Sequence, residues 1–209
     1  MSTAARALPA GVHWIGDGAL RFALGDIAAS RSRFEQLRAL PGVSDVVLAE
    51  THGMVVFAAD FDDTHVTSVL QALEHAPDAG EVAAREHVVH VRYDGMDLGH
   101  VAERTGLSVP SVIERHARAR YVVKSLGFAP GFAYLGDLDT RLVLPRRATP
   151  RVRVPRCAVG IAGARTGIYP AEMPGGWHLL GTAIEFAPFD PESGACLQPG
   201  DRVRFERVA

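Results

Sequence analysis

The stretch from Gly127 to Gly200 holds eleven glycines and nine prolines, and this density constrains the fold more than any other feature of the 209-residue chain. Proline lacks the backbone N–H that a helix interior needs, and glycine weakens a helix through its conformational freedom. The apolar segments in between are short and rich in β-branched residues. We therefore expect this half to form a β-barrel or sandwich with long, shaped loops.

Residues 1–84 show a different pattern, in which short apolar segments alternate with amphipathic ones. An alternating segment at 19–24 predicts a strand, and apolar residues at helical spacing follow Ser30, which we expect to cap that helix. Residues 46–57 indicate a hairpin, and a second amphipathic helix is expected over 64–76. Strand, helix, hairpin and helix in this order predict a small α+β sandwich.

The two halves of the chain also differ in charge. Residues 1–86 carry six arginines against twelve acidic residues, so acidic residues outnumber basic ones by six. Residues 87–209 carry sixteen basic against twelve acidic residues, although the whole chain has a formal charge of only -2. We expect two domains with different tasks, 1–84 and 85–209, joined by a linker at 77–81.

Cysteine content and hydropathy give an expectation about the compartment. Only Cys157 and Cys196 occur, too few for a disulfide framework in a chain of this length. No apolar run approaches the ~20 residues that cross a bilayer, and the first residues lack the apolar core of a signal peptide. We expect a cytoplasmic protein with no membrane partner.

Residues 97–119 predict two helices separated by Gly106 and Leu107 and followed by a basic tail. The pattern resembles a helix-turn-helix DNA reader. DNA-binding domains carry a strongly basic surface, whereas this chain has a formal charge of -2. We therefore interpret the segment as a helical insertion that packs on the barrel, and we expect no nucleic-acid partner.

Standard catalytic and cofactor signatures are absent from the sequence. There is no Gly-x-Ser-x-Gly elbow, no GxxxxGK[ST] phosphate loop and no dinucleotide-binding fingerprint after a strand. His87 and His90 are three residues apart on an apparent strand, so their side chains point to opposite faces, and no Cys/His cluster lies nearby. We expect no metal site, and any nucleotide needs an atypical or shared site.

Two loops of the glycine- and proline-rich half have unusual compositions. Residues 127–135 place Phe128, Phe132 and Tyr134 between glycines and a proline, which suits the rigid apolar wall of a binding site. A tight barrel corner filled by aromatic rings fits the same residues equally well. Residues 141–156 hold six arginines and no acidic residue, which favours guanidinium groups held ready for a carboxylate or phosphate. For any single arginine, a solvated surface position is the simpler interpretation.

A third loop region, residues 163–182, alternates hydrogen-bonding side chains with glycines that let a ligand approach backbone amides. It offers charge, hydroxyls and one group that titrates near neutrality. Its candidate site residues are Arg165, Thr166, Tyr169, His178 and Thr182.

Four blocks in this half resemble the KipI family, whose members are also called the B subunit of 5-oxoprolinase or allophanate hydrolase subunit 1. The blocks are GFAPGFAYLGDLD, LPRRATPRVRVP, AGARTGIYPAEMPGGWHLLGT and LQPGDRVRF, and RYDGMDLGHVAERTGLSVPSVIERH resembles the family's preceding segment. The chain departs from the family pattern at Ala129 and Ala133, where bulkier and cyclic residues are usual. It also lacks an arginine directly before Thr182.

The resemblance implies an α+β and mainly β fold: a small N-terminal α+β sandwich domain followed by a cyclophilin-like β-barrel with a short helical insertion. It implies one component of an ATP-dependent 5-oxoprolinase, which opens 5-oxoproline to glutamate with hydrolysis of ATP. The partners would be a KipA-type C subunit and a LamB/YcsF-type A subunit, with Mg-ATP bound by the assembled complex. The alternatives are an inhibitor of a sporulation-like histidine kinase, or one component of an allophanate or urea amide hydrolase.

Loop composition and the resemblance together assign roles around a small acidic substrate. Anion contacts come from arginines, orientation from hydroxyl groups, proton transfer or hydrogen bonding from a histidine, and an apolar wall from aromatic rings. The expected catalytic residues are His178, Arg165 and Tyr169. The expected substrate- or phosphate-binding residues are Arg146, Arg147, Thr166, Thr182, Phe128, Phe132 and Trp177.

Overall fold

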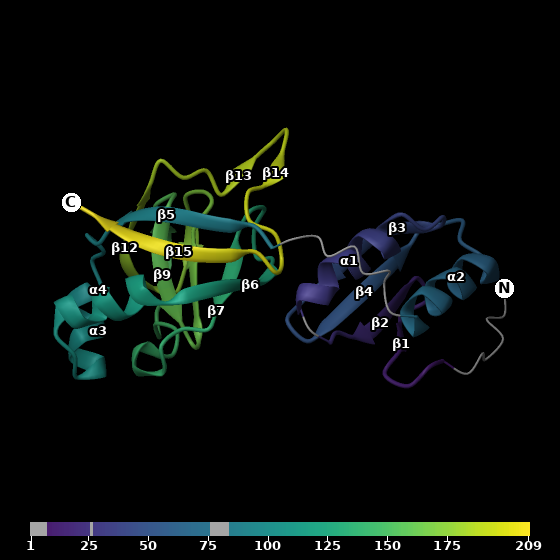
Figure 1. The fold of residues 1–209 in the computed structure, drawn as a ribbon, viewed down its shortest axis with the longest axis horizontal. Coiled ribbons are helices and arrows are strands. Elements are labelled where there is room, and N and C mark those ends of the chain that lie inside the picture. The colour runs from purple at the N-terminus through teal and green to yellow at the C-terminus, as the bar shows by residue number, and fades with distance from the viewer. Residues whose placement is uncertain (1–7, 26, 76–83) are drawn as a thin grey trace. The chain divides into compact units, whose positions relative to one another are not determined.

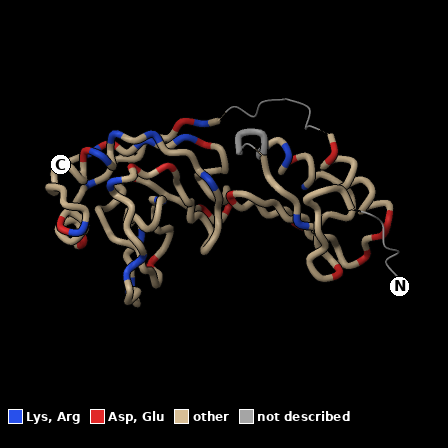
Figure 2. Tube along the Cα trace, turned by 90° about the horizontal axis from the view of Figure 1, so that it is seen from below, with Lys and Arg blue, Asp and Glu red and all other residues tan. Residues whose placement is uncertain are grey.

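The computed structural model describes three stretches of the chain, residues 8–25, 27–75 and 84–209. The polypeptide forms two compact units, 1–83 and 84–209 (Figure 1). We propose that they correspond to the two domains expected from the sequence, and the expected linker at 77–81 lies outside the described residues. Lys and Arg positions mark mainly the second unit in Figure 2, in line with the uneven charge.

The first unit is an antiparallel sheet of order β1-β2-β4-β3, with two helices on one face. Its elements are β1 (His13–Ile15), β2 (Ala19–Ala23), α1 (Ile27–Arg38), β3 (Val43–Leu48), β4 (His52–Phe57) and α2 (Asp63–Glu74). Alternate residues of the central strands, such as Leu20, Phe22 and Val55, point to the helices and are buried with Leu37 and Val69. The predicted α+β sandwich is therefore confirmed.

The local predictions for this unit differ from the structure in three places. Ser30 lies within α1, which begins at Ile27, so the expected start of this helix is wrong. Ala28 and Ala29 precede Ser30 in the helix, and alanine is a strong helix former. Strand β1 was not predicted, since three residues are too few to show an alternating pattern. Finally, α2 begins one residue before the expected start. Asp62 caps it, and its carboxylate accepts hydrogen bonds from the amides of Thr64 and His65.

The second unit is a closed barrel in which the strands follow the order β10-β7-β6-β15-β5-β12-β9. They are β5 (Glu86–Arg92), β6 (Arg120–Leu126), β7 (Ala133–Gly136), β9 (Ala158–Ala162), β10 (Arg165–Ile168), β12 (His178–Ile184) and β15 (Arg202–Val208). Two small ribbons lie outside it, β8 (Arg151–Val154) with β11 (Met173–Gly175) and β13 (Phe189–Asp190) with β14 (Gly194–Ala195). The predicted mainly β barrel is confirmed.

Two helices, α3 (Leu98–Thr105) and α4 (Val109–Arg118), separate β5 from β6 in the sequence. Gly106 ends α3 in the left-handed conformation with φ 66°, and the hydroxyl of Ser108 caps α4 by accepting a hydrogen bond from the amide of Ser111. Val101 and Val112 are fully buried in the barrel core. The segment that resembles a DNA reader is therefore a helical insertion that packs on the barrel, as expected.

A polar group from this insertion lies inside the barrel. His116 of α4 is 0% exposed, and its ring stacks on that of Phe205 with centroids 4.7 Å apart. The Thr166 hydroxyl donates to the carbonyl of Gly160 at 3.0 Å, so its oxygen accepts the hydrogen bond from His116 Nε2 at 2.8 Å. His116 Nδ1 then accepts from the Tyr93 hydroxyl at 2.7 Å. Burial lowers the pKa of His116 to about 3, so its ring is neutral.

Candidate functional site

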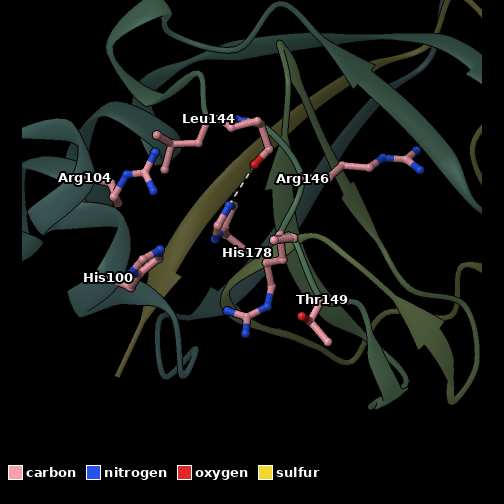
Figure 3. A pocket seen from close by; sticks show the side chains of 9 residues that line it. His100, Arg104, Leu144, Arg146, Thr149 and His178 are labelled. Carbon is pink, nitrogen blue, oxygen red and sulfur yellow. Dashed lines mark hydrogen bonds between the residues drawn. The ribbon is translucent and has the colours of Figure 1, made fainter.

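A cavity of about 420 Å³ opens between the helical insertion and the barrel (Figure 3). One wall comes from α3, the other from the loop that follows the short 3₁₀ turn Thr140–Leu142, and the start of β12 contributes a histidine. The lining residues are His100, Arg104, Leu144, Pro145, Arg146, Arg147, Ala148, Thr149 and His178. Part of the basic run of the sequence therefore lies against this cavity.

Asp97 connects the two walls and the strand. It is 4% exposed, and its Oδ1 accepts hydrogen bonds from Arg147 Nη1 at 3.0 Å and Arg151 Nη2 at 2.6 Å. Its Oδ2 accepts the backbone N–H of Leu179 at 2.7 Å. Burial opposes its ionisation, but the hydrogen bonds from Arg151 and Leu179 and the nearby positive charges outweigh burial and hold the pKa of the carboxyl below its usual range. Asp97 is therefore ionised, and its carboxylate holds the Arg147 side chain beside the cavity.

His178 is the first residue of β12 and is 5% exposed. Its Nε2 donates to the carbonyl of Pro145 at 2.9 Å, drawn as the dashed line in Figure 3. Nδ1 is buried and has no hydrogen-bond partner among the described residues. Burial lowers the pKa of His178, although the Pro145 carbonyl and Asp97 act in the opposite direction. The ring is therefore neutral near pH 7, and its Nδ1 is a hydrogen-bond acceptor.

The arginines around the cavity differ in how their charge is compensated. Arg147 is bound to Asp97, whereas Arg104 and Arg146 are exposed and form no salt bridge within the described stretches. In Figure 3 the Arg104 guanidinium turns from α3 toward the cavity, while the Arg146 side chain extends away from His178. The cavity thus has an uncompensated positive charge on its helical wall, which suits an anion.

Only three of the ten predicted site residues line this cavity, namely His178, Arg146 and Arg147. Arg165 lies elsewhere on the barrel, where its Nη1 donates to the carbonyl of Ala164 at 2.9 Å and approaches Asp137 at 3.9 Å. The Thr182 hydroxyl donates to Asp94 at 3.0 Å. Thr166 is 0% exposed and binds His116 inside the barrel, so a ligand in the cavity does not reach it.

Four aromatic residues of the predicted site lie outside the cavity lining: the expected wall residues Phe128, Phe132 and Trp177, and the expected catalytic residue Tyr169. Phe132, Tyr169 and Trp177 are buried, and the Phe132 ring meets the other two edge-on at centroid distances of 5.4 and 5.3 Å. Burial raises the pKa of the Tyr169 hydroxyl. Phe128 is 62% exposed, with a φ of 71°, and its ring rests against Phe132. The interpretation as an aromatic-filled barrel corner therefore describes this loop better.

Sequence reasoning missed three residues of the site, Asp97, His100 and Arg104. His100 and Arg104 are four residues apart on α3, a spacing that places both on one face of a helix. This spacing is visible in the sequence, but the prediction for this segment considered only the apolar residues that pack on the barrel. Asp97 precedes α3 yet makes no side-chain capping bond to it, because both carboxylate oxygens are used by Arg147, Arg151 and Leu179.

The described stretches, residues 8–25, 27–75 and 84–209, also bear on metal binding and membrane insertion. No group of three or more His, Cys, Asp or Glu side chains that could hold a metal ion occurs in these stretches. In the same part of the chain, no helix combines the length and apolar character needed to span a membrane.

Known proteins similar to this chain match it in sequence over about half of its length. It is 50% identical over 121 residues to the B subunit of 5-oxoprolinase from Escherichia coli O157:H7, covering 56% of this chain and 55% of that protein. It is 44% identical over 117 residues to the B subunit of 5-oxoprolinase from Bacillus subtilis (strain 168), covering 55% and 48%. The chain thus spans about half the length of the curated relatives it matches.

Solved structures extend the likeness to nearly the whole chain. TTHA0988 has a TM-score of 0.80 and 38% identity, covering 91% of this chain and 40% of that one. PH0987 from Pyrococcus horikoshii, described as a conserved uncharacterized protein, has a TM-score of 0.57 and 31% identity, covering 94% and 97%. The urea amidolyase of K. lactis shares the fold alone, with a TM-score of 0.71 and 17% identity over 95% of this chain and 15% of that one.

The family model for the carboxyltransferase domain, subdomain C and D, matches residues 11–196. This range includes most of the first unit, the helical insertion and every residue that lines the cavity. The curated relatives carry the name of the family that the sequence blocks resemble, the B subunit of 5-oxoprolinase. The chain belongs to the carboxyltransferase domain family, subdomain C and D.

Proposed function

We propose that this chain supplies the B-subunit part of an ATP-dependent 5-oxoprolinase, acting with a KipA-type C subunit and a LamB/YcsF-type A subunit in the cytoplasm. The observation that carries the proposal is the 44–50% identity to proteins named as the B subunit of 5-oxoprolinase. The free thiols of Cys157 and Cys196 agree with a reducing compartment. The working pocket of this chain is the cavity between α3 and β12.

The cavity has the chemistry that opening a lactam requires. A lactam carbonyl is a poor electrophile, and negative charge grows on its oxygen as water attacks. Arg104, Arg146 and Arg147 lie around the cavity, and Arg104, which turns toward it, is the cation that stabilises an anionic group there. His178 is neutral and offers an acceptor nitrogen, so it is the residue that accepts a hydrogen bond or a proton from the substrate.

ATP would make the lactam reactive by phosphorylating its oxygen. This chain has arginines that suit a phosphate group but no glycine-rich phosphate loop, so we propose that the assembled complex binds Mg-ATP. Arg165, Tyr169, Thr166 and Thr182 remain outside the cavity, and we assign the substrate contacts to the cavity residues instead.

The test is a reconstituted complex of this chain with its two partner proteins, assayed for ATP hydrolysis that depends on 5-oxoproline. His178→Ala should lower kcat about 100-fold or more, the size expected when a proton-transfer group is lost. His90→Ala is the matched control, because His90 is an exposed histidine of β5 that pairs with Glu206 at 3.5 Å outside the cavity. It should stay within about twofold of the unchanged complex.

A substrate panel decides between this function and its relatives. We expect 5-oxoproline, but not allophanate or urea, to stimulate ATP hydrolysis by the complex. Stimulation by urea or allophanate alone would overturn the proposal in favour of an amide hydrolase. Equal rates for the unchanged and His178→Ala complexes with 5-oxoproline would contradict a catalytic role for the cavity. They would not contradict the role of the chain as one component of the complex.

A further inference from the structure

We propose that the cavity binds a small carboxylate whose charge pairs with Arg104 of the helical insertion, while Nδ1 of His178 accepts a hydrogen bond from an N–H group of the same ligand. The inference rests on the proposed function only for the identity of that ligand as a lactam acid. It makes α3, which the sequence relates to no chemistry, one half of the binding site.

Arg104 is the arginine that binds the ligand carboxylate, because the other arginines either bind Asp97 or point away from His178. Arg147 and Arg151 both donate to the carboxylate of Asp97, so both side chains are already engaged inside the protein, and that carboxylate balances one of their two charges. Arg146 extends away from His178, whereas Arg104 turns toward the cavity from one turn beyond His100 (Figure 3). Arg104 forms no salt bridge within the described stretches, and a planar guanidinium binds a carboxylate through two parallel hydrogen bonds.

His178 is the acceptor because its tautomer is fixed. Its Nε2 must carry the proton, since it donates to a backbone carbonyl, that of Pro145. Nδ1 therefore holds a lone pair, and this buried nitrogen has no partner among the described residues. A buried polar atom without a hydrogen bond is unfavourable, so a ligand donor that reaches it gains affinity.

His100 borders the approach to that nitrogen. Its ring is stacked on the ring of His178, with centroids 5.5 Å apart and planes 24° from parallel. His100 is exposed at its position on α3, so its side chain has room to turn aside when a ligand enters. The cavity of about 420 Å³ lies at the lower end of the range for small-molecule sites, which suits a ligand of amino-acid size.

The chemical class follows from these two contacts. One group of the ligand must be an anion that fits a guanidinium fork, and a second must be a neutral N–H donor. A lactam acid such as 5-oxoproline carries both, whereas 2-pyrrolidinone has the same ring and N–H without the carboxylate. The pair of ligands therefore separates the Arg104 contact from the His178 contact.

The experiment measures binding to the full chain by calorimetry, with L-5-oxoproline and 2-pyrrolidinone as probes. Arg104→Gln should weaken 5-oxoproline about tenfold to 100-fold, as expected when a charge-assisted contact is lost, and should leave 2-pyrrolidinone within twofold. Arg202→Gln is the control, because Arg202 is an exposed arginine of β15 and lies outside the cavity lining. It should bind both probes as the unchanged chain does. Arg104 is exposed, so circular dichroism of the variant should match that of the unchanged chain.

Three outcomes would overturn the proposal: no saturable binding of any carboxylate to the unchanged chain, equal 5-oxoproline affinity in Arg104→Gln, or an equal loss for both probes. A separate result addresses the proposed function. Acetate that shifts the imidazole resonances of His178 in an Arg104-dependent manner, with 5-oxoproline no tighter than acetate, would support the carboxylate site and contradict the lactam substrate. Conversely, 5-oxoproline-dependent ATP hydrolysis unaffected by Arg104→Gln would support the proposed function and overturn this inference.

Discussion

Replacing Asp97 with alanine is expected to lower the free energy of unfolding of the barrel unit by about 3–5 kcal/mol, the usual cost of removing one partner of a buried ion pair. Asp97 is 4% exposed and binds Arg147, Arg151 and the amide of Leu179. Without its carboxylate, the guanidinium groups repel each other and a buried amide loses its acceptor. The loss combines a charge effect with a hydrogen-bond effect.

Urea-induced unfolding, followed by circular dichroism and intrinsic fluorescence, measures this change. Asp94→Ala is the matched control, because Asp94 is an exposed residue that pairs with Arg92 at 2.7 Å and accepts from Thr182. An exposed ion pair contributes at most about 1 kcal/mol. Asp97→Asn should fall between the two, since the amide oxygen still accepts one hydrogen bond but carries no charge. A loss below about 1 kcal/mol for Asp97→Ala would contradict the role of Asp97 as a stabilising buried ion-pair partner.

The stability of the barrel unit is expected to fall as the pH drops below about 6.5, and His116 accounts for part of that fall. His116 is neutral in the folded protein with a pKa of about 3, whereas in the unfolded chain it binds a proton near its ordinary pKa. The unfolded state therefore binds more protons between these values, and the stability contribution present above pH 6.5 is lost on acidification. The limit for one group is about 1.4 kcal/mol per pH unit.

His116→Gln removes the titration while keeping one acceptor and one donor near Tyr93 and Thr166. The variant should be less stable at pH 7, because it loses the ring stacked on Phe205, but its unfolding free energy should depend less steeply on pH. Other titrating groups contribute equally to both proteins, so the difference between the two pH profiles isolates His116. Parallel profiles between about pH 4.5 and 7 would show that His116 is not a neutral buried group.

Local patterns in the sequence predict the elements well where apolar spacing is regular. Helix α2, the two helices of the insertion and strand β15 follow directly from the periodicity of their apolar residues and from their caps. The barrel as a whole was expected from the glycine- and proline-rich composition and from the family resemblance. Ser30 shows the limit, because two alanines before a good capping residue are enough to move the start of a helix.

The site was harder to predict because its parts come from distant places in the sequence. Asp97 and Arg151 are 54 residues apart, and nothing local to either one indicates that they meet. Glycine-flanked hydroxyls such as Thr166 looked available for a ligand, but strand alternation turns that side chain into the barrel interior. Sequence composition pointed to a basic, polar region, of which Arg146, Arg147 and His178 line the cavity. Which arginine forms no salt bridge depends on the fold.

The parallel pairing of β15 with β5 has a consequence for how the barrel forms. Arg202 through Val208 align with Glu86 through Arg92, so the first and last strands of the barrel are neighbours. Asp201 accepts a hydrogen bond from the amide of Arg85, a contact 116 residues apart along the chain. Contacts of such separation form slowly, since a long loop must close before they stabilise the structure. During synthesis, one edge of β5 therefore stays unpaired until β15 has left the ribosome. The strands of the first unit, in contrast, have all been synthesised before β5.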